Sequence, residues 1–414
     1  MASLVHQAAE NYATLSMEEE QAIGLRRLRR VREQAAHYRL SAVILFDPVN
    51  IRYATGARNM QVYSARNPAR FVFIPVQGPV VLFEYRACEH LSAHLDTIDE
   101  IRPAQPIMPL HSGYKHVRHQ QDFVAAIEEL VAQHGVNGRR IGIEATTTGA
   151  VLALANAGFE VMDAQIPVER ARALKVPGEI DMIRSSLRLT EAAVREMEEA
   201  LVPGVSENEL WSRLHQKLIS GGGDYIETRL LTSGSHTNPW FQETSEKIIN
   251  AGDLVAFDTD AVGCYGYYSD FSRTFLAGDG PASPAQRTLY ALAQEQIETN
   301  IELLRAGVAF REYSEKAWPI PHPYQKHRYL AVLHGCGMTG EYPIVSHAGD
   351  WEAVGHDDDE VFLPGMTVCV ESFIGHEDGG EGVKLEEQVL ITNDGVERLS
   401  TYGYCDRLSA CQRA

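Results

Sequence analysis

The chain has 414 residues, of which 44% are hydrophobic and 22% charged, and its formal net charge is -19 at pH 7. This length exceeds one ordinary hydrophobic core, so we expect two domains. The acidic charge argues against nucleic acid or an anionic membrane as a partner. The chain has no run of about 18 apolar residues, which argues against a membrane-spanning helix. It begins without the basic and apolar regions of a secretory signal, and its six scattered cysteines include no CxxC pair. These features are typical of a cytoplasmic protein with reduced thiols.

The first half alternates helix and strand patterns. We expect a helix with a basic face over residues 18–39, a buried strand over 41–47, and a hairpin over 69–85 that turns at Gln77–Gly78. The segments RRIGIE and GFEVMDA, with an Ala/Leu-rich stretch from Thr148 between them, predict a β-α-β unit. Together they indicate an α/β domain, which we assign to residues 1–174.

A proline and a glycine in ARALKVPGEI, residues 171–180, mark the boundary to a second domain. A periodic apolar face predicts a helix over residues 180–201. Ser206 with Glu209 forms a capping-box pattern for the next helix, and Ser283-Pro284-Ala285-Gln286 starts a third. Strand pairs lie between and after these helices. Residues 175–414 therefore read as an α+β domain in which helices pack on an antiparallel sheet.

Three acids stand out in FDTDAVGCYGYYSD, residues 257–270. If LVAFDTD is a strand, Asp258 and Asp260 point to the same face, because side chains alternate along a strand. Two glycines allow a turn near the middle of this stretch, after which YYSDFSRTF returns. Such a turn places Asp270 opposite the first two aspartates.

The same pattern recurs near the C-terminus. The segment TVCVESFI reads as a strand, HEDGGEG as a turn and VKLEEQVLIT as the returning strand. The midpoint of the turn makes Glu371 and Glu386 face each other. Between the two hairpins, YLAVLHGCG reads as a strand that carries His334 near its end.

Each of these acids taken singly fits a solvated loop, whereas their combination indicates a metal site. Uncompensated buried charges cost several kcal/mol each. Five carboxylates and one imidazole suit hard or borderline divalent cations, and two such ions offset most of the negative charge. The absence of a predicted thiolate argues against a structural zinc site.

The segments GDLVAFD, GYYSDFSRTF, HGCG and EEQVLIT resemble the pita-bread family of methionine aminopeptidase, aminopeptidase P, prolidase and creatinase. The resemblance covers the whole second half, and the N-terminal domain is similar to that of the prolidase and creatinase branch. It implies an α/β N-terminal domain followed by an α+β pita-bread catalytic domain, in a homodimer. It also implies a two-metal centre with a ligand set of Asp258, Asp270, His334, Glu371 and Glu386.

Asp260 is an additional acid that, with TNPWFQE and DPVNIRYATGARNM, resembles the branch of DddP-type dimethylsulfoniopropionate lyases. The resemblance to that branch implies six ligands, the five named above and Asp260, which hold two iron ions. Mn, Co and Zn suit the same ligands. It implies cleavage of the C–S bond of a small zwitterion by β-elimination, giving dimethyl sulfide and acrylate. Aromatic faces can hold a sulfonium cation, and the candidates are Tyr63, Trp240, Tyr329 and Tyr342. We also expect Tyr329 to be catalytic.

Three departures from the peptidases and lyases leave the identity of the substrate open. The peptidases have a substrate-binding histidine where this chain has NPWFQE, and another histidine where it has Glu341. The lyases have an aspartate, the expected proton-abstracting base, where this chain has Gly340. Glu341 beside it is the candidate base. The alternatives are an Xaa-Pro dipeptidase-like hydrolase of a C–N bond and a binding module without catalysis, whose mark would be a broken ligand set.

Overall fold

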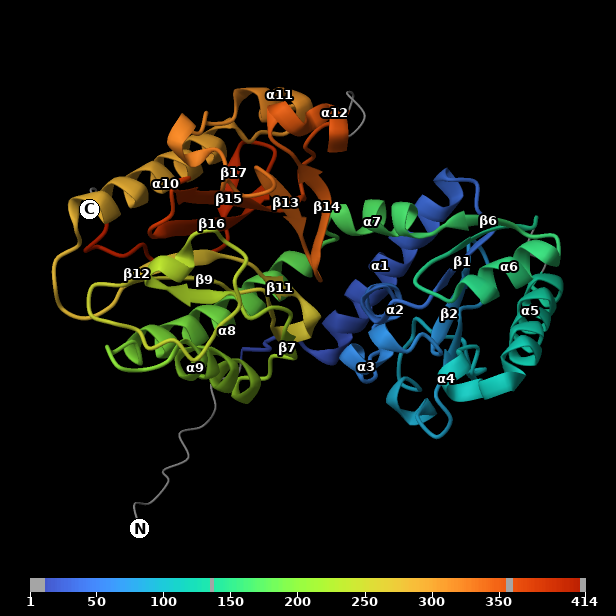
Figure 1. Ribbon diagram of the computed structural model, residues 1–414. Coiled ribbons are helices and arrows are strands. Elements are labelled where there is room, and N and C mark those ends of the chain that lie inside the picture. Colours follow the sequence, from blue (N-terminus) through green and yellow to red (C-terminus); the bar gives the residue numbers. More distant parts are fainter. Residues whose placement is uncertain (1–11, 135–137, 355–359, 410–414) are drawn as a thin grey trace, which may run out of the picture. The chain divides into compact units, whose positions relative to one another are not determined.

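The computed structural model describes residues 12–134, 138–354 and 360–409 (Figure 1). It divides into two compact units, which are described separately. The N-terminal unit comprises residues 15–172 and 176–178, and the C-terminal unit comprises residues 12–14, 173–175 and the described chain from residue 179 onward.

The N-terminal unit is built on one six-stranded mixed sheet with the order β4-β3-β2-β1-β5-β6. Its strands are β1 (Ala42–Leu45), β2 (Phe71–Pro75), β3 (Val81–Glu84), β4 (Glu100–Pro103), β5 (Arg140–Ile143) and β6 (Glu160–Asp163). Its helices are α1 (Met17–His37), α2 (Pro48–Thr55), α3 (Gln61–Arg66), α4 (Pro109–Ser112), α5 (His116–Gln133), α6 (Thr148–Asn156) and α7 (Gln165–Ala173).

The predicted elements of this unit are present. Helix α1 starts at a capping box in which Ser16 and Glu19 satisfy each other's backbone N–H groups. Strands β2 and β3 form the expected antiparallel hairpin, and Gly78 in its turn has φ 114°, which favours glycine. Strands β5 and β6 run parallel, as the β-α-β pattern predicted.

The C-terminal unit contains only antiparallel strand pairs among its described residues, in three sheets of orders β11-β10-β7, β12-β9-β8 and β14-β13-β15-β16-β17. The strands of the two smaller sheets are β7 (Tyr225–Ile226), β8 (Leu231–Ser233), β9 (Leu254–Asp258), β10 (Ala261–Val262), β11 (Tyr268–Ser269) and β12 (Ser272–Leu276). Those of the largest are β13 (Leu333–Cys336), β14 (Gly340–Val345), β15 (Thr367–Gly375), β16 (Gly382–Ile391) and β17 (Val396–Arg398). The helices are α8 (Glu179–Glu199), α9 (Glu207–Ser220), α10 (Pro284–Leu303), α11 (Phe310–Lys316) and α12 (Trp351–Val354).

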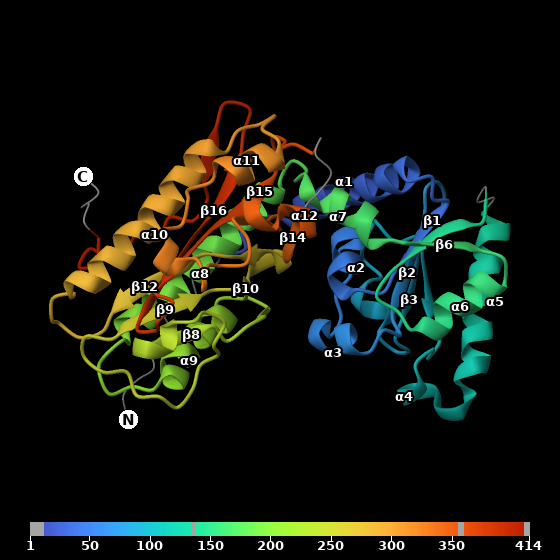
Figure 2. The ribbon, with the colours of Figure 1, turned by 45° about the horizontal axis from the view of Figure 1, so that its top comes forward.

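Helices cover both sides of these sheets. Helix α10 packs on β15 and β16, and α8 and α9 lie on the opposite side (Figures 1 and 2). The capping boxes predicted at Ser206 and Ser283 are both formed. A large apolar cluster of this unit joins α10 to β13, β15 and β16, among others through Ile297, Val370 and Leu385. This core holds the strands that carry the predicted metal ligands.

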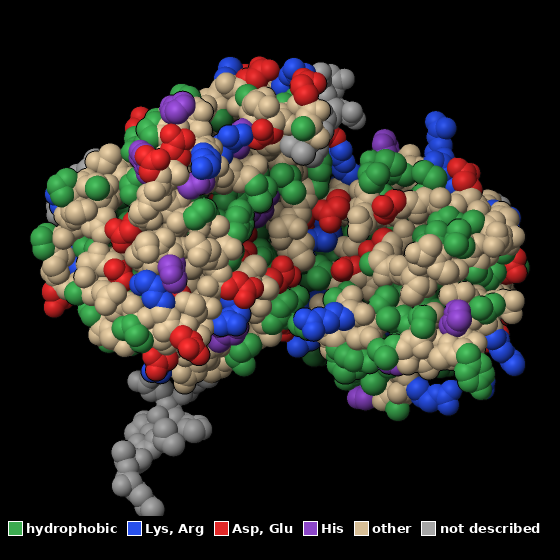
Figure 3. Space-filling model, in the orientation of Figure 1, with side chains coloured by type: hydrophobic (Ala, Val, Ile, Leu, Met, Phe, Trp, Pro, Cys, Tyr) green, Lys and Arg blue, Asp and Glu red, His purple; other side chains and the backbone are tan. Residues whose placement is uncertain are grey.

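The surface and the thiols give limited further information. On the face drawn in Figure 3, within the described part of the chain, Lys and Arg side chains are interspersed with Asp and Glu. No helix in the described ranges is long and apolar enough to cross a membrane. The five described cysteines are free thiols.

Candidate metal centre

The second hairpin follows the sequence expectation closely. Strands β15 and β16 pair without interruption from Thr367↔Leu390 to Gly375↔Gly382, and Glu371 is the direct partner of Glu386. Both side chains are buried. The regular antiparallel register therefore brings two carboxylates together on one face.

The first hairpin is less regular than its sequence predicted. Strand β9 ends at Asp258 rather than continuing through Asp260, and Asp260 has a left-handed φ of 38°. The chain then turns at the 3₁₀ segment Cys264–Gly266 and returns as β11 and β12. Asp270 lies between these two strands, two residues before Ser272, the register partner of Asp258. Oxygens of all three aspartates still lie within 4.8 Å of one another.

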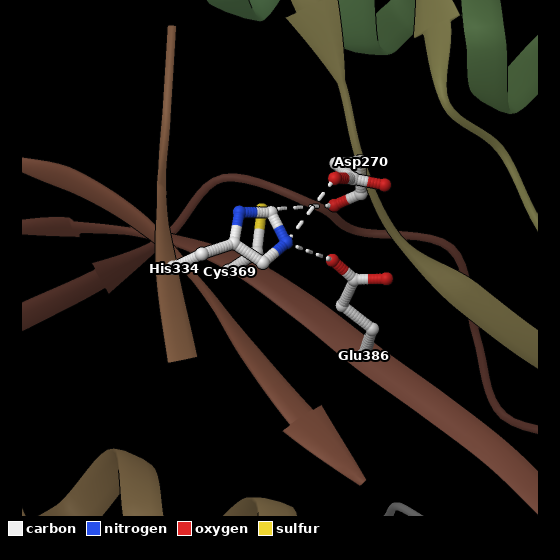
Figure 4. A group of neighbouring side chains, drawn as sticks. All are labelled: Asp270, His334, Cys369 and Glu386. Atoms are coloured by element: carbon white, nitrogen blue, oxygen red, sulfur yellow. Dashed lines mark hydrogen bonds and ion pairs between the residues drawn. The ribbon is translucent and has the colours of Figure 1, made fainter. Parts of the chain in front are cut away.

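His334 projects from β13 toward the acids of both hairpins (Figure 4). Its Nε2 lies 3.2 Å from Glu371 Oε1, 3.5 Å from Asp270 Oδ2 and 3.7 Å from Glu386 Oε1. Its Nδ1–H donates to the carbonyl of Gly335 at 2.9 Å. That hydrogen bond fixes the ring and leaves Nε2, the atom facing the carboxylates, for a metal ion.

The hydrogen bonding of the carboxylate oxygens indicates whether this site fits a metal. Four buried oxygens accept no hydrogen bond, one from each of four acids: Asp258 Oδ1, Asp270 Oδ1, Glu371 Oε1 and Glu386 Oε1. Buried acceptors normally have partners, and leaving one unpaired is costly. Carboxylate oxygens with an imidazole nitrogen are a ligand set for divalent cations. The donor set therefore fits the two metal ions expected from the sequence.

Lys384 is a member of this site that the sequence analysis missed. It lies on β16, two residues before Glu386, and is fully buried. Its Nζ is 2.7 Å from Glu371 Oε2, 3.1 Å from Asp258 Oδ2 and 3.1 Å from Glu386 Oε2. Alternation along VKLEE places Lys384 and Glu386 on the same face, and this signal could have identified it.

Burial and mutual repulsion govern the ionisation of the acids. Burial, followed by the charge of Asp258, raises the pKa of Asp260 to about 7. Burial, then Glu386 and Asp258, raises the pKa of Asp270 well above its ordinary value. Burial opposes ionisation of Asp258, yet Lys384 and nearby hydrogen bonds bring its pKa below the ordinary value. Without metal, protons and Lys384 together therefore compensate these carboxylates.

Hydrogen bonds from neighbouring residues orient Asp260. The hydroxyl of Tyr268 donates to Asp260 Oδ1 at 2.7 Å, and Thr228 donates to Oδ2. Because both oxygens are held, the position of this carboxylate is fixed even though its backbone lies outside the strand.

A thiol also reaches this cluster, although the sequence analysis expected none. Cys369 Sγ lies within 4.8 Å of ligand atoms of Asp270, His334 and Glu386. Cys369 lies on β15 opposite His334, and its thiol donates to the carbonyl of Asp270 at 3.6 Å (Figure 4). Burial raises the pKa of the Cys369 thiol well above its ordinary value.

The aromatic residues proposed for substrate binding lie in different surroundings. Lys384 Nζ lies 4.7 Å from the ring centroid of Tyr329 and 5.8 Å from that of Trp240, so both rings already face an internal cation. Tyr342 lies on β14 and packs against Phe310. Tyr63 lies in the N-terminal unit, where it is 43% exposed and contacts His111.

Glu341, the candidate base, is held in a buried ion pair. Its Oε1 lies 2.5 Å from Lys175 Nζ, and both side chains are 1% exposed. A Cβ at the neighbouring Gly340 would meet the imidazole of His334 at 3.8 Å, an ordinary van der Waals contact. His236, which stands near the position of the missing peptidase histidine, is exposed and lies 3.9 Å from Glu207.

Comparison with known proteins agrees with this architecture. The model of metallopeptidase family M24 matches residues 181–393, and that of the creatinase/prolidase N-terminal domain matches residues 27–174. The dimethylsulfoniopropionate lyase DddP of Roseovarius nubinhibens is 37% identical over 369 residues, which are 87% of this chain and 82% of that protein. The DddP of Roseobacter denitrificans is 36% identical over 91% of this chain and 85% of its own length.

Peptidases of the same fold are more distant. An Xaa-Pro dipeptidase of Pyrococcus furiosus is 26% identical over 56% of this chain and 64% of its own. The structure of a prolidase from Thermococcus sibiricus superposes with a TM-score of 0.74 at 20% identity, covering 94% of this chain and 99% of that one. An Xaa-Pro dipeptidase from Bacillus anthracis superposes with a TM-score of 0.72 at 21% identity, covering 92% and 98%.

Proposed function

The chain belongs to metallopeptidase family M24, and from that premise we propose that it is a dinuclear metal-dependent lyase. Its reaction is cleavage of the C–S bond of dimethylsulfoniopropionate, or of a similar small zwitterion, to dimethyl sulfide and acrylate. One observation carries this proposal. The likeness to DddP proteins extends over 87–91% of the chain at 36–37% identity, whereas that to the dipeptidase of Pyrococcus furiosus covers 56% at 26%.

The proposed metal ligands are Asp258, Asp260, Asp270, His334, Glu371 and Glu386. Four carboxylate oxygens without a hydrogen-bond partner, and the His334 Nε2 that faces two of them, support this assignment for five of the six residues. Two divalent ions bound here would polarise a substrate carboxylate and lower the cost of an adjacent carbanion. Iron is proposed by resemblance to the lyase branch, and Mn, Co and Zn suit the same donors.

The remaining groups define what the chain itself does in the elimination. A base takes the proton from the carbon next to the substrate carboxylate, the electron pair forms the C=C bond, and the C–S bond breaks toward sulfur. Glu341 is the proposed base. Its carboxylate forms an ion pair with Lys175, and it would have to give up this ion pair to accept the substrate proton. Burial, then Glu371, raises the pKa of the Tyr329 phenol, which keeps it protonated as a donor. Trp240, Tyr342 and Tyr63 remain proposed substrate contacts.

Glu341→Gln tests the base. We expect dimethyl sulfide release to fall by about 10²–10⁴-fold, the usual contribution of general acid–base catalysis, while the metal content stays unchanged. Tyr329→Phe is the companion variant. A Glu341→Gln protein with unaltered turnover would exclude Glu341 as the base and make the metal-ligand acids the next candidates.

The function itself is tested by gas chromatography. Metal-loaded protein should release dimethyl sulfide and acrylate in equal amounts from dimethylsulfoniopropionate, and chelator-treated protein should not. The runner-up, hydrolysis of Xaa-Pro dipeptides, is favoured by the prolidase-like fold. Dipeptide hydrolysis without dimethyl sulfide would decide for it, and neither activity with a full metal complement would support a binding module.

We further propose a homodimer in the cytoplasm, with the domain boundary between residues 174 and 175. The assembly follows from the family resemblance, and light scattering on the purified protein measures it directly. A mass equal to that of the monomer would exclude the proposed dimer.

A further inference from the structure

In three of the proposed metal ligands, the two oxygens of the carboxylate face different partners. In Asp258, Glu371 and Glu386, the second oxygen (Oδ2 or Oε2) faces Lys384 Nζ at 2.7–3.1 Å. The first oxygen of each acid accepts no hydrogen bond. Two of these free oxygens, those of Glu371 and Glu386, face His334 Nε2 instead. One ammonium therefore holds three carboxylates from one side and leaves their other side for metal.

Lys384 is itself fixed in place. Its side chain is fully buried and its Nζ donates to Ser272 Oγ at 2.7 Å as well as to the acids. The rings of Tyr329 and Trp240 face the ammonium from a further direction. Ser272 also donates to Glu386 Oε2, which ties β12 to the same arrangement. A lysine enclosed in this way cannot turn to solvent when metal binds.

The charges of the centre then balance. Two divalent ions offset four of the five carboxylate charges, and the ammonium of Lys384 offsets the fifth. A buried centre with no net charge avoids the large desolvation cost of an uncompensated ion.

We propose that Lys384 is the positioning residue of the metal centre: its ammonium holds Asp258, Glu371 and Glu386 together before metal binds, and it remains as the counter-charge that the two divalent ions leave unmatched. This inference rests on the metal centre that the proposed function requires, but not on the substrate. It predicts that Lys384 matters most when metal is absent, because its ammonium is then the main fixed cation among these acids.

The test compares thermal unfolding of metal-free and metal-loaded protein, with Mn²⁺ as the probe. In Lys384→Met, which keeps most of the length of the side chain and removes its charge, we expect the metal-free melting temperature to fall much further than the metal-loaded one. The gap between the two states should widen by about 5 °C or more. Lys384→Arg keeps the charge and should restore the wild-type gap. Lys247→Met is the control, since Lys247 pairs with Asp253 outside this centre and its loss should leave the gap unchanged.

Each outcome decides the proposal. A Lys384→Met protein that folds only with metal is the extreme form of the expected result. Equal destabilisation of both states, failure to fold in both, or a narrower gap would show an ordinary packing role and overturn it. A failed dimethyl sulfide assay would remove the proposed function without changing these melting temperatures, so the two failures are distinguishable.

Discussion

The two hairpins that carry the acids differ in how they place them. In the β15–β16 hairpin every residue from Thr367 to Gly375 has a register partner, and each strand contributes one glutamate to the metal site. In the hairpin that starts with β9, the ladder breaks after Asp258, Asp260 takes a left-handed conformation, and Asp270 lies between two short strands. In the regular hairpin the strand register brings the acids together. In the irregular one, a break in the ladder and a left-handed backbone conformation bring them together.

This difference has a physical reason. A regular antiparallel ladder puts side chains directly opposite each other, or two residues apart along one face. Gathering three aspartates within 4.8 Å from one hairpin requires the chain to leave the ladder. A left-handed non-glycine residue costs about 1–2 kcal/mol. That cost is sustained because Tyr268 and Thr228 hold the carboxylate of Asp260.

The largest effect is expected in the regular hairpin. Glu386→Gln removes a charge from an acid that faces both His334 and Lys384, with little change in shape. We expect metal to be lost and dimethyl sulfide release to fall by about 10³-fold, because the metal centre supplies several kcal/mol of stabilisation. Metal analysis and gas chromatography measure both.

Glu397→Gln is the matched control for that variant. Glu397 lies on the adjacent strand β17, is exposed and pairs with Arg184. Its loss should leave metal content and turnover unchanged. A Glu386→Gln protein that retained two metals per chain would remove Glu386 from the ligand set.

A smaller effect is expected at Asp260 in the irregular hairpin. Asparagine tolerates the left-handed backbone, so Asp260→Asn should change the charge without straining the turn. We expect about one metal per chain in place of two, and turnover reduced about 10²-fold. Asp260→Ala should lose the same metal and, in addition, roughly 1 kcal/mol of stability from its backbone.

Elemental analysis and thermal unfolding separate these two contributions. If both variants keep a full metal complement, Asp260 is not a ligand. If both variants lose the same metal and are equally stable, the left-handed backbone carries no cost.

The contrast between the hairpins also explains how much the sequence could predict. Strict alternation around Glu371 and Glu386 and a glycine-rich turn determine a register, and that register is observed. The α/β and α+β classes and the two capping boxes at Ser206 and Ser283 followed from equally local patterns. The convergence of Asp258, Asp260 and Asp270 was predicted, but through a continuous strand that the structure lacks.

Most of what could not be predicted from the sequence is non-local, although alternation along VKLEE does place Lys384 on the face of Glu386. Nothing near Lys384 in the sequence shows that its ammonium meets Asp258 from another strand, or that Lys175 pairs with Glu341. Cys369 enters the cluster only because β13 and β15 are neighbours. Contacts of this kind depend on sheet order, which alternation within single strands does not encode.

The smallest effect we predict is a pH dependence of the metal-free protein. The pKa of Asp260 is about 7 in the folded state, against an ordinary 3.8. The folded protein therefore holds a proton that the unfolded chain has released, and stability falls as pH rises from about 4 through 7. Asp270 and Glu386 act in the same direction, because burial and neighbouring acids raise the pKa of each.

Glu144 complicates this measurement, because burial, then Asp47, raises its pKa to about 8 in the N-terminal unit. The contribution of the irregular hairpin is isolated by Asp260→Asn, which has no proton to lose and should show a shallower fall in melting temperature, by a few degrees. Bound metal should flatten the wild-type curve in the same way, since cations then replace the protons of the cluster. The slope due to Glu144 should persist under both treatments. If neither metal nor the substitution changed the slope between pH 5 and 8, Asp260 would titrate as an ordinary surface acid, and its left-handed position would have no electrostatic consequence.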